Sequence, residues 1–156
     1  MDLGVRRRML RRLLAALASA LAASCGMSES REESVAIADR YFAAISTGDV
    51  ASALGFYSPQ FFAATPRADM ERILKDLAQR CGKVNSHKLV AWTTTTPFGA
   101  SASKTVLVYD VQYSNCEVKE TMSISKPDGG AAQIVGHRIN AQPTDSGHAS
   151  KPAQSI

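Results

Sequence analysis

The sequence predicts an α+β domain in which N-terminal helices pack on an antiparallel sheet of about four strands. Two observations lead to this fold class. Apolar residues recur at helical spacing between residues 33 and 82, whereas the segments between residues 88 and 140 are rich in β-branched residues and are bounded by turn residues. A run of helices followed by a run of strands is typical of domains whose helices cover one face of an antiparallel sheet.

The first helix is predicted over residues 33–45, and Gly48 ends it. Its apolar side carries Val35, Ala38, Tyr41, Phe42 and Ile45. A second, short helix is predicted after Asp49, whose side chain can cap it. This helix runs to Tyr57, and Ser58-Pro59 closes it.

The third helix is predicted from Thr65-Pro66, a cap candidate followed by proline at the first helical position, to Gly82. Everything after this glycine is predicted to form strands. The four candidates are Lys88 to Thr95, Lys104 to Tyr113, Cys116 to Ser125 and Gln133 to Asn140. Residues 126–130, which contain Pro, Asp and Gly, predict a turn between the last two strands.

Residues 1–24 have the pattern of a signal peptide. Arginines are concentrated at positions 6–12, and an apolar run of Leu, Ala and Ser follows from Leu13 to Ala23. This run is shorter than the roughly 20 apolar residues that a membrane-spanning helix needs. We therefore expect export from the cytoplasm.

Cys25 follows this leader directly. The stretch Leu21-Ala22-Ala23-Ser24-Cys25-Gly26 resembles a bacterial lipobox, which implies a cysteine carrying three fatty-acyl chains, palmitate among them. Because Gly26 follows the cysteine, the resemblance implies an outer-membrane lipoprotein that faces the periplasm. The alternative is ordinary cleavage near Ala20-Leu21-Ala22, which gives a soluble periplasmic or secreted protein with a free Cys25 thiol.

The basic charge of the chain belongs to the leader. Residues 1–24 hold five arginines and one aspartate of the 18 basic and 14 acidic residues in the chain, which leaves 13 of each in the mature part. A balanced domain has no excess of positive charge for nucleic acid, so no nucleic-acid partner is expected.

The mature chain predicts one folded domain between two polar segments. Residues 25–32 are expected to form a polar tether and residues 33–140 the α+β domain. Residues 141–156 are rich in Pro, Ser, Ala and Gly and have no apolar periodicity, which predicts a disordered tail.

Two stretches of the domain resemble the nuclear transport factor 2-like superfamily. Residues 41–59, YFAAISTGDVASALGFYSP, are similar to its opening helices, and Ile134-Val135-Gly136-His137-Arg138-Ile139 is similar to its last strand. The last strand resembles in particular that of uncharacterised bacterial secreted domains and lipoproteins of this superfamily. The resemblance implies a cone-shaped roll, with a strongly curved sheet wrapped around the helices and an apolar pocket at the open end. Some members are enzymes such as ketosteroid isomerase, and many are non-enzymatic binding modules.

The hairpin formed by residues 104–125 predicts its own register. If Ser114-Asn115 are the turn, paired residues have numbers that sum to 229. One face is then apolar, and on the other Asp110 lies opposite Lys119, a favourable pair. Glu120, opposite Tyr109, is the one ionisable residue on the apolar face.

Glu120 is the candidate pocket residue, because a carboxylate among apolar side chains needs a partner or a function. In the functional interpretation it lines the pocket with Tyr109 and Tyr41 as possible hydroxyl donors. In the structural interpretation it bonds Tyr41, Arg40, Arg138 or a backbone amide. His87, His137 and His148 are expected at the surface or the rim.

The sequence predicts neither a metal nor a cofactor. It has three scattered histidines and no Cys-x-x-Cys pattern, and it has no glycine-rich phosphate loop. Cys81 and Cys116 are expected to form a disulfide in an oxidising compartment. The alternative is two buried thiols that pack as small apolar groups.

Two function classes follow from these observations. The first is a non-catalytic, membrane-tethered domain that binds a small apolar ligand in the cone, or an envelope protein or second copy on the outer sheet face, where Val106, Val108 and Thr121 form a half-apolar surface. The second is a small acid–base enzyme that acts through Glu120. We expect the first, because no catalytic partner for Glu120 can be placed from the sequence, and no catalytic residue is therefore assigned.

Overall fold

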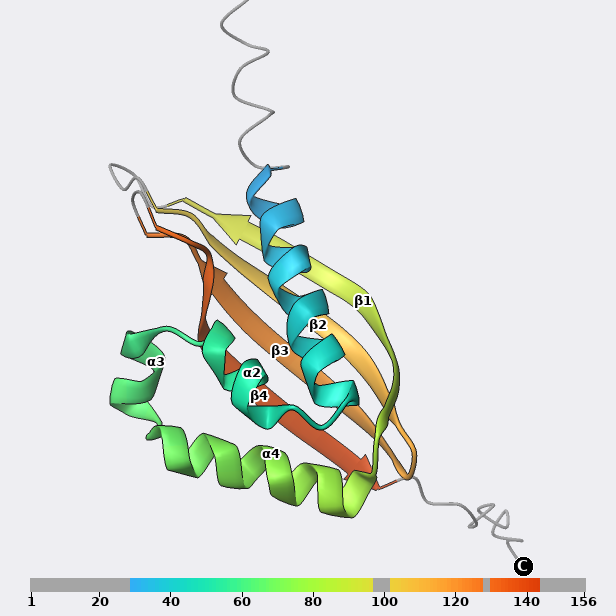
Figure 1. Cartoon of the computed structure of the whole chain (residues 1–156). Helices are drawn as coiled ribbons and strands as arrows, with labels where there is room; N and C mark the ends of the chain where they lie inside the picture. The colour runs from blue at the N-terminus through green and yellow to red at the C-terminus, as the bar shows by residue number, and fades with distance from the viewer. Residues whose placement is uncertain (1–28, 97–101, 128–129, 144–156) are drawn as a thin grey trace, which may run out of the picture.

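The computed structural model describes residues 29–96, 102–127 and 130–143. The predicted signal peptide, Cys25 and residues 144–156 of the tail lie outside these ranges. Within them, the helices lie on one face of a four-stranded antiparallel sheet (Figure 1). This arrangement confirms the predicted α+β class.

The helical half starts with a long helix, described over residues 29–46. Gly48 ends it with a φ of 78°, in the left-handed region that glycine adopts without strain. Three short or medium helices follow, α2 (Val50–Ala53), α3 (Pro59–Ala64) and α4 (Arg67–Cys81), with a 3₁₀ turn η1 (Leu54–Phe56) after α2. No helix within the described residues is long and apolar enough to cross a membrane.

The predicted caps agree with the structure at α2 and differ at α3 and α4. The Thr65 cap was wrong, because α4 begins at Arg67 and its N-cap is Pro66, with no side-chain cap. Asp49 accepts a hydrogen bond from the Ser52 N–H at 3.0 Å, as expected. The prediction that Ser58-Pro59 only closes a helix was wrong, because this step also starts α3. The Ser58 hydroxyl accepts from the Phe61 N–H at 3.1 Å, and Pro59 occupies the first turn, where its missing N–H costs nothing.

The sheet consists of β1 (Val84–Thr95), β2 (Lys104–Tyr113), β3 (Cys116–Ser125) and β4 (Gln133–Pro143), in that order. The predicted register of the β2–β3 hairpin is confirmed, since Asp110 pairs with Lys119 and Tyr109 with Glu120. Leu107, Tyr109, Val118 and Met122 lie in the core between the sheet and the helices.

The folded part is longer than predicted at both ends. The first helix includes residues 29–32, which we assigned to the tether, and β4 extends three residues beyond 140. Polar contacts hold the helix start, since the Ser103 hydroxyl bonds that of Ser30 at 3.0 Å and Lys126 pairs with Glu33 at 2.9 Å. Such polar turns have no apolar periodicity, so the sequence pattern did not reveal them.

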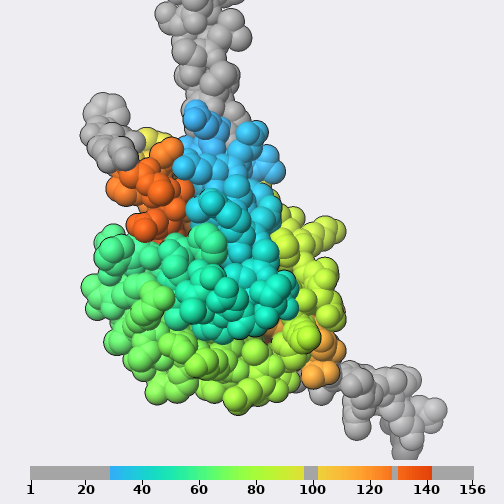
Figure 2. Space-filling view, viewed as in Figure 1, coloured from blue at the N-terminus to red at the C-terminus, as the bar shows by residue number. Residues whose placement is uncertain are grey.

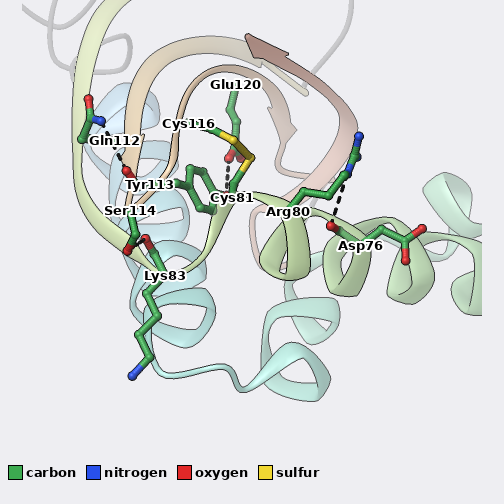
Figure 3. The surroundings of a disulfide bond; sticks show 9 residues. All are labelled: Asp76, Arg80, Cys81, Lys83, Gln112, Tyr113, Ser114, Cys116 and Glu120. Atoms are coloured by element: carbon green, nitrogen blue, oxygen red, sulfur yellow. Dashed lines mark hydrogen bonds between the residues drawn. A yellow bond between two sulfur atoms is a disulfide. The ribbon is translucent and has the colours of Figure 1, made fainter. Parts of the chain in front are cut away.

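A disulfide joins Cys81, the last residue of α4, to Cys116, the first residue of β3, as predicted. Their Cα atoms are 5.0 Å apart. Two backbone hydrogen bonds of 2.9 Å lie beside it, from the Ser114 N–H to Lys83 and from the Asn115 N–H to Cys81. Figure 3 shows that this connection lies next to Tyr113 and Glu120.

Candidate functional site

The candidate site is a cluster of polar side chains inside the core. Glu120 of β3 and His137 of β4 have side chains that are 0% exposed. The tyrosines around them are buried as well and come from three further segments: Tyr41 from the long helix, Tyr57 from the residue after η1, and Tyr113 from β2. The cluster therefore joins the helices to three strands.

Both carboxylate oxygens of Glu120 have partners. The Tyr113 hydroxyl donates to Oε1 at 2.9 Å, and His137 Nε2 lies 3.0 Å from Oε2. On the other side of the imidazole, the Tyr57 hydroxyl lies 2.6 Å from Nδ1. A hydrogen-bonded chain thus runs from Tyr57 through His137 and Glu120 to Tyr113.

One pattern of protons satisfies every bond in this chain. If Glu120 is ionised, the neutral imidazole donates its Nε2–H to the carboxylate, and Nδ1 accepts from the Tyr57 O–H. The Tyr113 O–H completes the shell of the carboxylate. A buried charge that is hydrogen-bonded in this way costs far less than an unpaired one.

Burial raises the pKa of the tyrosines. The pKa of Tyr113 and of Tyr41 is raised first by burial and then by the negative charge of Glu120. Burial likewise raises the pKa of Tyr57, and it raises the pKa of Tyr109, with a contribution from Asp39, to about 12. All four phenols are therefore protonated at neutral pH.

The Tyr41 and Tyr109 hydroxyls are buried without a hydrogen-bond partner among the described residues. The Tyr41 ring stands edge-on to His137, with centroids 5.4 Å apart. Tyr57 interacts with Tyr41 electrostatically, but no hydrogen bond of normal geometry joins their hydroxyls. Tyr41 therefore packs against the imidazole ring of His137 but makes no hydrogen bond to it.

The structure places some of the predicted residues near Glu120, but its hydrogen-bond partners differ from the predicted ones. Glu120 is inside the core, as the hairpin register required, with Tyr41 and Tyr109 buried near it. Its hydrogen-bond partners are Tyr113 and His137, and not the Tyr41, Arg40, Arg138 or backbone amide of the structural interpretation.

The expectation that His137 lies at the surface or rim was wrong. Ser123 pairs with Gly136 while Ile124 pairs with Ile134, so Val135 is an extra residue in β4. This bulge reverses the alternation, and both Ile134 and His137 point toward the helices. His137 pairs with Met122, a core residue of β3. Had this pairing been predicted, it would have placed His137 on the core side of the sheet.

The other histidines differ from His137. The His87 side chain is 30% exposed and contacts Asp39 at 3.1 Å, while its ring stacks on Phe42. His148 lies outside the described residues. In the part of the chain that the structure describes, no group of three or more His, Cys, Asp or Glu side chains is arranged to hold a metal ion.

Two cavities of the described surface lie away from this cluster. A groove of about 450 Å³ on the outer face of the sheet is lined mainly by Ser86, Lys88, Asp110, Gln112, Glu117 and Lys119. A smaller one of about 250 Å³ lies along the first turns of the long helix. Glu120, Tyr41 and Tyr109 line neither of them.

The outer face of the sheet is the side that the described helices do not cover (Figure 1). Val106, Val108 and Thr121 lie at its centre and are half-buried. Beside them, Lys119 pairs with Asp110 at 2.5 Å, and Lys88 lies opposite Asp110 on β1. The face therefore has a partly apolar centre and a border of mixed charge.

Comparison of the chain with protein-family models, with curated proteins and with solved structures finds no match.

Proposed function

We propose that this chain is an envelope-anchored, non-catalytic binding domain that docks a protein on the outer face of its sheet. The burial and hydrogen bonding of Glu120 are the observation that supports a non-catalytic role. Its side chain is fully buried and both of its oxygens already have hydrogen-bond partners within the core, so no atom of it is exposed to a substrate or ligand. The core acid is then a structural group, and the accessible surface is elsewhere.

The anchor in this proposal is a lipid on Cys25, with the domain facing the periplasm from the outer membrane. The lipobox-like sequence supports it, and a disulfide is typical of proteins outside the cytoplasm. We also assign the domain to the nuclear transport factor 2-like superfamily. The helix-then-meander order and the sequence of residues 41–59 support this assignment.

A protein partner fits the outer face better than a small apolar ligand. Interfaces between separately folded proteins combine an apolar centre with a polar, hydrated border. Val106 and Val108 supply such a centre, and the groove with Lys88, Asp110 and Lys119 supplies charges of both signs. A second copy of the chain is the other occupant that this surface could take.

An acid–base enzyme is the alternative, and one observation favours it. His137 lies between a carboxylate and the Tyr57 hydroxyl, as a base lies between its orienting acid and a reactive hydroxyl. Tyr57, however, is buried, and burial raises its pKa, which opposes formation of the phenolate. We therefore assign the chain of hydrogen bonds to the stability of the core.

Changing Cys25 to Ser is expected to move the protein from membranes to the soluble fraction without altering its thermal unfolding, because the change removes the thiol that takes the lipid and leaves every residue of the described helices and strands unchanged. The measurement is fractionation of a bacterium with two membranes, followed by intact mass of the purified protein. Ser28→Ala is the matched control and should stay with the membranes. Wild-type protein that is soluble, unacylated and cut near Ala22 would contradict the anchor.

A further inference from the structure

One end of the domain gathers the start of the long helix and the adjoining ends of the strands. The Ser103 hydroxyl, just before β2, bonds that of Ser30, and the Ser125 hydroxyl at the end of β3 donates to the carbonyl of Ser103 at 3.2 Å. Arg31 lies over the ring of Trp92 in β1. We call this region the helix-start end. Figure 2 shows the first residues of the helix, in blue, beside the orange-red start of β4 at this end.

The chain between Cys25 and the helix is short. An extended chain covers at most about 3.5 Å per residue, so the four steps from Cys25 to residue 29 reach about 14 Å. A lipid on Cys25 therefore keeps the helix-start end close to the bilayer surface. The disulfide lies at the other end of β3, at its first residue Cys116. With the helix-start end at the bilayer, it would face away from the membrane.

Two exposed apolar side chains lie on the edge strand β1, and Trp92 is the one beside the helix-start end, where Arg31 contacts its ring. Trp92 is 48% exposed and Val90 is 42% exposed. Trp92 lies opposite Leu107, on the helix side of the sheet, and Val90 is the extra residue of a bulge between Leu89 and Ala91. Because β1 is at the edge of the sheet, no described strand covers them from the side.

The chemistry of these residues fits a lipid headgroup layer. Tryptophan is enriched where membranes meet water, because its ring is apolar and its indole N–H is polar. The Arg31 guanidinium, 4.8 Å from the centre of the Trp92 ring, adds a cation, and its Nε has no hydrogen-bond partner among the described residues.

Electrostatic attraction to anionic lipid contributes little to this contact. Residues 29–33 include the acids Glu29, Glu32 and Glu33 besides Arg31, and Lys126 is already paired with Glu33. The contact therefore depends on the Trp92 side chain and on the short anchor. It should form on zwitterionic and on anionic membranes alike.

We propose that Trp92, with Arg31, forms a membrane-contact surface that orients the anchored domain. This inference rests on the proposed anchor at Cys25. The phospholipid bilayer is the partner, and the helix-start end faces it. The strands then run away from the membrane, and the outer face of the sheet stays open to proteins of the envelope.

The chain contains one tryptophan, so its fluorescence reports on Trp92 alone. Protein purified from the envelope with its lipid is reconstituted in phosphatidylethanolamine and phosphatidylglycerol vesicles, with or without brominated acyl chains. We expect Trp92 emission to shift to shorter wavelength and to lose intensity in the brominated vesicles. The Cys25→Ser protein, mixed with the same vesicles, should show neither change.

The matched control moves the fluorophore to α4. Ile73 is 43% exposed, and in a Trp92→Phe, Ile73→Trp protein the emission should be insensitive to bromine. If the lipidated protein floats with vesicles but Trp92 is not quenched, the orientation is wrong and the anchor stands. If the protein does not float with vesicles, both proposals fail.

Discussion

Replacing Glu120 with alanine is expected to lower the free energy of unfolding by about 3–5 kcal/mol, the usual loss when one partner of a buried pair is removed. The change leaves the Tyr113 hydroxyl and His137 Nε2 without their acceptor inside the core. Urea unfolding of the Cys25→Ser protein, with the disulfide intact, measures the loss.

A double-mutant cycle tests whether the two residues act as a pair. His137→Ala should cost a similar amount, and the Glu120→Ala, His137→Ala protein should lose clearly less than the sum of the two single changes, because contacting residues are not additive. Glu120→Gln is the matched control. It keeps the shape and an acceptor for Tyr113, so its loss should be smaller than that of Glu120→Ala. Additive losses, or a Glu120→Ala protein as stable as wild type, would contradict a structural role for the pair.

Removing the disulfide is expected to cost about 3–4 kcal/mol in the chain-entropy model, given the 35-residue separation of the two cysteines. Cys81→Ala and Cys116→Ala should destabilise the domain equally, and the double variant no more than either single one. The native fold should persist, because the hydrogen bonds from Ser114 to Lys83 and from Asn115 to Cys81 do not depend on the sulfurs.

Wild-type protein in excess reductant is the control for this prediction, and its urea midpoint should fall to that of the double variant. Clearly additive losses for Cys81→Ala and Cys116→Ala would mean that each thiol contributes by packing alone, which would contradict the bridge as the source of stability.

Local patterns in the sequence were sufficient to predict most of the fold. Apolar spacing predicted the long helix and α4. The Ser114-Asn115 turn predicted the β2–β3 register, and the opposition of Asp110 to Lys119 supported it. From that register the burial of Glu120 followed without further information. The helical turns at residues 29–32 were missed because polar contacts, not apolar ones, hold them.

The partners of Glu120 could not be predicted from these patterns. His137 reaches the core through the extra residue Val135, and a bulge depends on pairing with the neighbouring strand, which the sequence of β4 alone does not reveal. Tyr57 joins the cluster because the segment before α3 is attached to β4, where the Ser58 N–H donates to Ile134 at 3.0 Å. Contacts between distant segments thus determine the partners of Glu120, and local sequence patterns do not reveal such contacts.

The central claim is that the outer face of the sheet binds a protein, and photocrosslinking in intact cells tests it most directly. A benzoylphenylalanine introduced at Val108 should give one discrete adduct, and adding Thr121→Arg on the same face should abolish it. The same probe at Ile73, on α4, should give none. An adduct of twice the protein's mass would identify the partner as a second copy. An adduct from position 73 and none from position 108, in protein that is folded and membrane-bound, would contradict the claim.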